Sequence, residues 1–321
     1  MKNYFVIGLM IFSLSLFSQG GFSPGVGELG CTGIHKDSSI IKSWANTCKV
    51  IRGYQNILNK NLGKTSVGDS SKAIGIADNI VVSLGDRGEA TLQFDGELFD
   101  GPGPDFAVFE NGFDDYFLEL AFVEVSSDGV NFFRFPSQSL TDNSNQVRSF
   151  DSLDATNLHN LAGKYRLFYG VPFDLADLNG TQGLDISKVT HVKIIDVVGS
   201  IRDSVASRDV NGRKINDPFP TAFPSGGFDL DAVAAIHIKP TGIQVQNIQK
   251  LSVYPNPSHG FIKFEKSFYN ANLQVFDLNG RLIEEQIFSG NSIDLNEIVS
   301  SLYFIKISTA SSVFQTKILI E

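Results

Sequence analysis

The sequence predicts an all-β protein made of two consecutive β-sandwiches. Short apolar runs alternate with turn residues, no long segment shows helical periodicity, and the character of the chain changes near residue 249. The first sandwich is organised around Phe99 to Pro136, where apolar runs at 105–110, 117–125 and 132–135 are separated by turns. Carboxylates stand at the ends of these runs, so we expect a sandwich with an acidic corner.

Four further apolar runs complete the first sandwich. They lie at Val81–Leu84, Ala90–Phe94, Val189–Val198 and Asp229–Ile238, and we expect each to form a strand. The segment before them is rich in Gly and Ser and is expected to wrap around the domain. Its amphipathic piece at Ser39–Cys48 is expected to form one or two helical turns.

Composition places the chain among ordinary globular proteins of about two domains, with 321 residues, 42% hydrophobic and 19% charged. The formal net charge is -9, and residues 20–249 carry 28 acidic against 19 basic side chains. The acidity therefore belongs to the first domain and argues against nucleic acid as its partner. Most of the 27 Phe side chains are expected in the cores, because Phe is a frequent core aromatic of β-sandwiches.

The N-terminus predicts an exported protein. Lys2 is followed by an apolar run from Tyr4 to Phe17, which is too short to span a bilayer and is typical of a cleaved signal peptide over residues 1–19. The mature chain then has two cysteines, Cys31 and Cys48, in an oxidising setting. We expect a disulfide between them that pins the N-terminal wrap, with two free thiols as the alternative.

Three segments of the first domain resemble discoidin-like (galactose-binding-like) jelly rolls. Val123–Phe133 resembles their hairpin, with Asp128-Gly129 supplying the positive φ of the turn. Val189–Val198 and Asp229–Ile238 resemble the core and closing strands that follow. The resemblance covers roughly residues 75–240 and implies a jelly-roll β-sandwich, a fold that hosts many binding functions, within a domain at 20–240 that includes the N-terminal wrap. The stretches GPGPDFAVFEN and PSGGFDLDAV also resemble uncharacterised bacterial cell-surface proteins.

The tail, residues 249–321, follows a polar linker at 241–248 and contains short, regularly spaced strands typical of a small Ig-like sandwich. It resembles the type A C-terminal sorting domain of the type IX secretion system of Bacteroidetes, through YPNPSHG, LQVFDLNGRLI, SSLYFIKI and QTKILIE. At Ser301 the sequence departs from the family, which usually has Gly at this position before the Leu-Tyr pair. The resemblance implies that the type IX machinery binds this tail. It further implies that the tail is removed after export, with the protein then attached to surface lipopolysaccharide or released.

Calcium is the cofactor that the sequence favours, because hard cations take several oxygen ligands and this domain concentrates carboxylates in Gly-rich loops. The resemblance implies a structural calcium beside the closing strand at Asp231. The alternative is that these residues form Asx turns without metal. The candidate ligands fall into three groups: Asp100, Asp105 and Glu110; Asp229 and Asp231; and Asp209, Asn211 and Asp217.

The long loop at 200–228 is the candidate ligand-binding segment, since loops of this length are functional or disordered in compact domains. Its prolines and glycines equally favour an ordered structural flap. The side chains able to hold an anionic or sugar ligand are Arg202, Arg208, Arg213, Phe219 and Phe223.

Catalytic motifs are missing from the sequence. The five histidines form no H-E-x-x-H pair or Cys/His metal spacing, and no G-x-S-x-G elbow occurs. The preferred function is therefore a surface-attached or secreted binding module for a glycan or another extracellular ligand. The alternatives are a secreted hydrolase with its site on the 200–228 loop and a structural adhesin.

Overall fold

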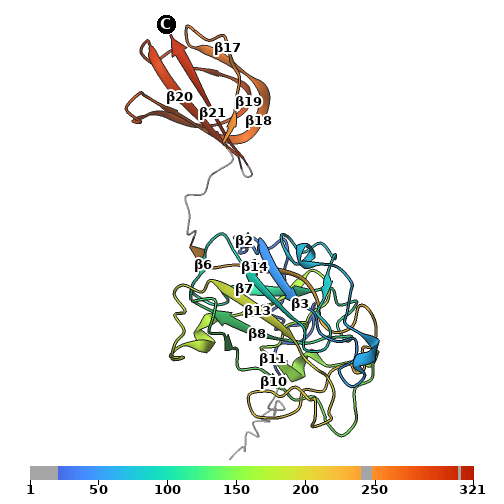
Figure 1. Ribbon diagram of the computed structural model, residues 1–321. Helices are drawn as coiled ribbons and strands as arrows, with labels where there is room; N and C mark the ends of the chain where they lie inside the picture. Colours follow the sequence, from blue (N-terminus) through green and yellow to red (C-terminus); the bar gives the residue numbers. More distant parts are fainter. Residues whose placement is uncertain (1–20, 240–247, 310–311) are drawn as a thin grey trace, which may run out of the picture. The chain divides into compact units, whose positions relative to one another are not determined.

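The computed structural model describes residues 21–239, 248–309 and 312–321. The predicted signal peptide and most of the predicted linker lie outside these residues. The chain divides into two compact units at residue 241 (Figure 1). Within the described residues, no helix is long and apolar enough to cross a membrane.

The structure is all-β, which confirms the predicted fold class. Its helical content is confined, in the described ranges, to four short 3-10 turns: η1 (Lys60–Leu62), η2 (Ser70–Ala73), η3 (Ala155–Asn157) and η4 (Leu175–Leu178).

Two sheets form the sandwich of the first unit. The first sheet has the order β1 (Ile34–His35), β12 (Tyr169–Phe173), β7 (Phe106–Glu110), β14 (Asp229–Ala235) and β2 (Ser43–Trp44), with β4 (Val82–Ser83) also paired to β14. The second has the order β3 (Thr47–Ile51), β5 (Glu89–Gln93), β13 (His191–Asp196), β8 (Ala121–Ser126) and β9 (Phe133–Arg134). Two small sheets flank them: β10 (Gln138–Ser139) with β11 (Leu158–His159), and β6 (Glu97–Leu98) with β15 (Ile238–Lys239).

The apolar patterns of the sequence explain where these strands lie. In β13 every second side chain is buried, as expected for a strand with one face on the core. β7 and β14 are buried along their whole length, and they form the centre of the first sheet. The main core between the sheets contains side chains of both, including Val108, Val123 and Ile194.

The predicted helical turns at Ser39–Cys48 are not formed, and this expectation was wrong. The segment contributes β2 and β3 instead. Along β3 half-buried and exposed side chains alternate, and all five of its residues pair with β5. Pairing to an existing sheet edge decides the conformation here, because a short segment of weak helix preference gains more from backbone hydrogen bonds and burial.

The second unit is a curled six-stranded sheet. Its order is β16 (Ile248–Lys250), β21 (Val313–Ile320), β20 (Ser301–Ser308), β18 (Phe261–Phe276) and β17 (Val253–Tyr254), with β19 (Leu282–Asp294) paired to β18. The hairpin predicted at Asn279-Gly280 joins β18 to β19, and Gly280 has φ +78°. A core of its own, including the mutually packed Phe264, Phe268 and Phe288, fills the concave side.

Candidate functional site

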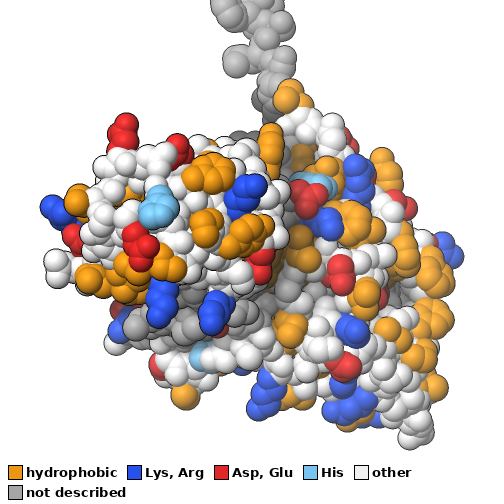
Figure 2. Space-filling view, turned by 90° about the horizontal axis from the view of Figure 1, so that it is seen from above, with side chains coloured by type: hydrophobic (Ala, Val, Ile, Leu, Met, Phe, Trp, Pro, Cys, Tyr) orange, Lys and Arg blue, Asp and Glu red, His pale blue; other side chains and the backbone are white. Residues whose placement is uncertain are grey.

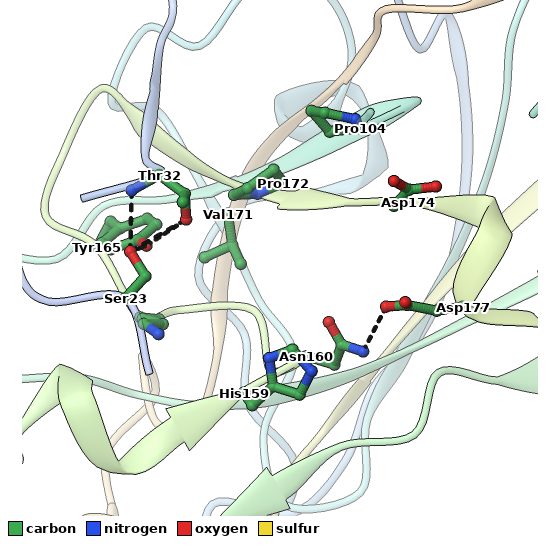
Figure 3. A pocket seen from close by; sticks show the side chains of 11 residues that line it. Ser23, Thr32, Pro104, His159, Asn160, Tyr165, Val171, Pro172, Asp174 and Asp177 are labelled. Carbon is green, nitrogen blue, oxygen red and sulfur yellow. Dashed lines mark hydrogen bonds between the residues drawn. The ribbon is translucent and has the colours of Figure 1, made fainter. Parts of the chain in front are cut away.

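A pocket of about 440 Å³ opens in the first unit between the N-terminal segment, strand β12 and the turn η4 (Figure 3). We call it the Tyr165 pocket. Val171, Pro172 and Pro104 give it apolar walls. Its polar side chains stand on opposite sides, with Ser23 and Thr32 facing Asp174 and Asp177 across the opening (Figure 3).

Three hydroxyl groups meet on one side of this pocket. The Tyr165 hydroxyl lies 2.7 Å from Ser23 Oγ and 2.9 Å from Thr32 Oγ1, and Ser23 Oγ accepts the Thr32 amide at 2.8 Å. The Tyr165 ring itself is buried in the core. These bonds fix the N-terminal segment to the sandwich, and each hydroxyl can both donate to and accept from a ligand.

The other polar groups of the pocket are held by neighbours. Asn160 Nδ2 donates to Asp177 Oδ2 at 2.9 Å, and the His159 ring stacks on Phe22 at 4.8 Å between ring centroids. Burial lowers the pKa of His159, so the ring is neutral at pH 7 and can donate and accept. Lys164 donates to the Leu158 carbonyl at 2.6 Å, and burial lowers its pKa to about 8. None of these residues carries a motif that sequence reasoning could have recognised.

The predicted metal ligands at Asp100 and Asp105 lie beside this pocket. Their carboxylate oxygens and one of Asp174 lie within 4.8 Å of one another. Asp105 is fully buried and accepts the amides of Gly101 at 2.8 Å and Leu175 at 2.7 Å, in addition to lying 2.7 Å from His237 Nδ1. Its oxygens are therefore already engaged by protein donors.

Two other predicted metal ligands bind backbone amides. Asp209 Oδ1 accepts the amides of Asn211 and Arg213 at 2.9 Å, which is an Asx turn, and Asn211 is exposed. Asp231 accepts the amides of Asp78 and Asn79 at 3.1 Å, so both of its oxygens hold the loop before β4. These contacts match the alternative that the sequence left open for these residues.

The remaining predicted metal ligands, Glu110, Asp217 and Asp229, lie toward one end of the sandwich, but among the described residues their ligand atoms do not lie within 4.8 Å of one another. Glu110 and Asp229 lie in adjacent strands and Asp217 lies in the 200–228 loop. Three carboxylates that the sequence did not single out, Asp86, Glu119 and Asp196, are near enough to raise the pKa values of neighbouring carboxylates at this end.

The 200–228 loop is an ordered flap rather than an open binding loop. Asn216 is fully buried and donates to the carbonyls of Asp142 and Asn145 at 2.7 Å. Phe219 is buried against Val198 and Val205. The three predicted arginines, Arg202, Arg208 and Arg213, are exposed, and Arg208 pairs with Asp203 at 2.8 Å.

Phe223 belongs to a row of four aromatic side chains, of which three are exposed and Phe117 is half-buried. Phe113, Phe117, Phe150 and Phe223 follow one another with centroid separations of 6.0, 6.1 and 5.9 Å. Phe113 is 83% and Phe150 76% exposed. We call this set the aromatic row. A contiguous exposed apolar set of this kind marks an interaction surface more often than scattered single side chains do. On the face that Figure 2 draws, hydrophobic side chains are dispersed among charged ones of both signs.

The predicted disulfide is absent, because Cys31 and Cys48 are both free. Cys31 precedes β1 at one edge of the first sheet, whereas Cys48 lies on β3, an edge strand of the second. The short connection from β2 to β3 places Cys48 beside the β2 edge, opposite β1. The two thiols are therefore on opposite edges of the sandwich, although only 17 positions separate them in the sequence.

Comparison with known proteins identifies the tail. Residues 252–321 match the model of a secretion system C-terminal sorting domain. This confirms the assignment made from the sequence motifs. The sorting domain indicates a secreted or cell-surface protein that is exported by type IX secretion. No curated protein sequence matches the chain.

Similar solved structures add no argument about the first unit. PorZ, a bacterial surface component of the type IX secretion system of Porphyromonas gingivalis, is 13% identical, with 28% of this chain and 14% of PorZ covered and a TM-score of 0.20. A β-glucuronidase from Ruminococcus gnavus, in complex with D-glucaro-d-lactam, is 12% identical, with 87% and 45% covered and a TM-score of 0.21. The chain thus spans less than half of either protein.

Proposed function

We propose that this protein is a binding module exported by type IX secretion, with a discoidin-like jelly roll that takes an extracellular ligand into the Tyr165 pocket. The observation that carries the proposal is the pocket itself. Its volume of about 440 Å³ lies within the range of small-molecule sites, about 300–1,000 Å³. Apolar walls with a few converging polar groups are the usual composition of such sites.

A sugar ring is the ligand class that fits these walls best. Its hydroxyl groups both donate and accept, as do Ser23, Thr32 and neutral His159. Its apolar C–H face matches Val171 and the two prolines. Asp174 and Asp177 offer acceptors on the opposite side, which favours a neutral or amino sugar over a carboxylated one.

Binding is tested with a glycan array and isothermal titration calorimetry on the protein without residues 1–19. Asp177→Ala and His159→Ala remove pocket groups but leave the Tyr165 hydrogen bonds that hold the fold. Each is expected to weaken binding about tenfold, the cost of one hydrogen bond of about 1.4 kcal/mol. Asn211→Ala, an exposed change in the 200–228 loop, serves as the matched control and should bind as the unmodified protein does.

The other outcomes separate the competing functions. Binding that both pocket variants retain would place the ligand elsewhere. Turnover of an array sugar would favour the hydrolase, with its site on the 200–228 loop. The absence of both binding and turnover would favour a structural adhesin.

The fate of the exported protein belongs to the same proposal. Loss of the sorting domain after export would lower the mass of the mature protein by that of residues 249–321. Attachment to surface lipopolysaccharide would leave it in the membrane fraction with a heterogeneous mass, whereas release would leave a single species in the medium. Mass spectrometry of both fractions distinguishes the two.

A further inference from the structure

A second hollow, of about 500 Å³, lies on the outer face of the second sheet of the first unit. We call it the sheet groove. Strands β3, β5 and β13 form its floor, and the turn between β8 and β9 contributes Gly129 and Phe132. The sheet groove shares no lining residue with the Tyr165 pocket, so the two are separate places on the domain.

Strand alternation decides which side chains face this groove. Leu92 of β5 and Val192 of β13 are paired, and both are buried in the main core. Because successive side chains of a strand point to opposite faces, the paired Thr91 and Lys193 next to them face outward. Lys49 of β3 pairs with Thr91 from the other side. A row of three outward side chains, Lys49, Thr91 and Lys193, therefore crosses the floor of the groove.

This row is positively charged. Neither Lys49 nor Lys193 forms an ion pair within the described parts of the chain. Glu124 of β8 stands opposite Lys193, but Arg134 occupies it by donating two hydrogen bonds, of 2.8 and 3.0 Å. Three cations thus share one carboxylate across the sheet. The excess is opposite in sign to the domain as a whole, since residues 20–249 carry 28 acidic against 19 basic side chains.

Aromatic contacts hold one of the two lysines in place. Lys193 Nζ lies over the Phe132 ring, 3.6 Å from its centroid, and the His191 ring meets Phe132 edge-on at 6.2 Å between centroids. The ring attracts the ammonium group without neutralising its charge, so Lys193 can still bind an anion. Because the ammonium group is already positioned, less side-chain entropy is lost when a ligand binds.

Polar side chains at the same end of the groove are also fixed. His191 Nε2 lies 2.7 Å from Gln93 Nε2, and His191 Nδ1 lies 2.8 Å from Thr190 Oγ1. Burial lowers the pKa of His191, so its ring is neutral at pH 7. A neutral ring that accepts from Gln93 at Nε2 donates to Thr190 at Nδ1. The amide of Gln93 and the hydroxyl of Thr91 then lie side by side along β5, and both groups bind hydroxyls well.

Glu89 is the one carboxylate among the described residues that line the groove. It lies two residues from Thr91 along β5, a separation of about 7 Å. Its partners in the strand pairing are Ile51 and Ile195, not a lysine. The groove therefore offers ammonium donors in its middle and a carboxylate acceptor toward one end. A ligand that carries both an acid group and hydroxyl groups satisfies both, whereas a bare anion satisfies only the first.

We propose that the sheet groove binds an anionic saccharide, a sugar with a carboxylate or sulfate group, and that the acid group lies between Lys49 and Lys193. These lysines stand two strand spacings apart, about 10 Å, and their long side chains can both reach one acid group. Thr91, Gln93 and Glu89 bind the sugar hydroxyls. This site goes beyond the function proposed for the Tyr165 pocket, whose carboxylates favour a neutral or amino sugar.

The test is isothermal titration calorimetry at low salt on the protein without residues 1–19. The probes are oligogalacturonate for the carboxylate, carrageenan oligosaccharides for the sulfate and agarose oligosaccharides as the neutral counterpart. At least one anionic probe is expected to bind, and the neutral probe at least tenfold more weakly. Lys49→Gln/Lys193→Gln should lower the affinity for the anionic probe about tenfold or more. Lys42→Gln/Lys60→Gln removes the same charge from exposed positions outside the groove and should bind as the unmodified protein does.

Five results would overturn the site. They are no binding of either anionic probe, equal binding of the agarose probe, unchanged affinity in the Lys49→Gln/Lys193→Gln variant, an equal loss in the Lys42→Gln/Lys60→Gln control, and equally tight binding of polyglutamate. The last would mean that an acidic peptide, not a sugar, is recognised. If the double variant fails to fold, lysine acetylation of the unmodified protein decides instead. The anionic probe should protect Lys49 and Lys193 but not Lys42 and Lys60, and equal labelling with and without the probe would contradict the site.

The two saccharide sites fail independently. His159→Ala, which removes a group of the Tyr165 pocket, should leave the affinity for the anionic probe unchanged. Lys49→Gln/Lys193→Gln should likewise leave unchanged the affinity for a sugar bound in the Tyr165 pocket. A loss of anionic-probe binding in His159→Ala would place that ligand in the Tyr165 pocket and overturn the sheet groove.

Discussion

Gly163 occupies a backbone position that a larger residue cannot share. Its φ is +83°, and a Cβ atom there would lie 1.7 Å from the Glu119 carbonyl oxygen. Gly163→Ala is expected to lower the free energy of unfolding by about 3 kcal/mol or more, from backbone strain and steric overlap together. Gly180→Ala isolates the strain, because Gly180 has φ +77° with no atom within 4 Å. It should cost about 1–2 kcal/mol. Urea unfolding measures the stability of both variants. Equal losses of stability in the two would show that the close approach to the Glu119 carbonyl oxygen has no effect.

The buried carboxylate of Asp229 predicts a specific pH dependence of the stability of the first unit. Burial raises the pKa of Asp229 to about 7, whereas an unfolded aspartate titrates near 3.9. Between these two pKa values the folded state holds one proton more than the unfolded state. The stability that this protonated carboxyl contributes is fully present below about pH 4 and is lost as the pH rises toward 7.

Asp229→Asn removes this contribution, since the amide does not titrate. In EDTA, the unmodified protein should lose on the order of 3 kcal/mol more than the variant between pH 4.5 and 7.5. Urea unfolding at the two pH values gives the comparison. Parallel pH profiles for the two proteins would show that Asp229 titrates normally.

Sequence reasoning singled out three of the six carboxylates whose pKa values burial raises at this end of the sandwich. Glu110, Asp217 and Asp229 were identified because carboxylates at strand ends in Gly-rich loops are recognisable in a sequence. Asp196 and Glu119 were missed because their meeting depends on the register between β13 and β8, whose residues lie about 70 positions apart. Asp231 is the opposite case, a residue that the sequence singled out as a metal ligand. The structure shows that its two carboxylate oxygens accept hydrogen bonds from backbone amides instead.

At the scale of elements, strands with strong apolar patterns were predictable and short edge strands were not. β7, β13 and β14 lie within the predicted runs, and Gly129 has the positive φ expected of its hairpin. β2 and β3 were mistaken for helical turns because a two-residue and a five-residue strand hold their conformation through partners in other elements. The exposed aromatic row was missed for the same reason: three separate loops supply its rings.

The position of β3 also determines the chemistry of the cysteines. Burial raises the pKa of Cys48 to about 12, so the folded protein should alkylate slowly at this site at pH 8. In denaturant without reductant, both Cys31 and Cys48 should be labelled. Mass spectrometry counts the labels. A Cys31–Cys48 linked peptide would contradict the placement of these residues on opposite edges.

At the scale of the whole molecule, each unit has what it needs to fold by itself. The sandwich core lies within residues 26–238, and the tail core, from Leu251 to Ile320, is closed by its own strand pairs. The tail was the most predictable part of the chain, because its motifs fall on the strands and hairpin that build one sheet. Its function as a sorting signal requires only that it folds separately from the first unit.

Deleting Leu251–Glu321 should therefore leave the first unit folded but abolish its export. Thermal unfolding of the truncated protein is expected to give the Tm of the first transition of the full chain within about 2 °C, because no core residue is removed. In a host with type IX secretion, cell fractionation should find the truncated protein in the periplasm, whereas a fusion of residues 248–321 to an unrelated periplasmic protein should reach the surface or the medium. Surface display of the truncated protein would contradict the role of the tail in sorting. Loss of the first transition would instead contradict the independence of the two folds, because only a core that extends across residue 241 would depend on the deleted strands.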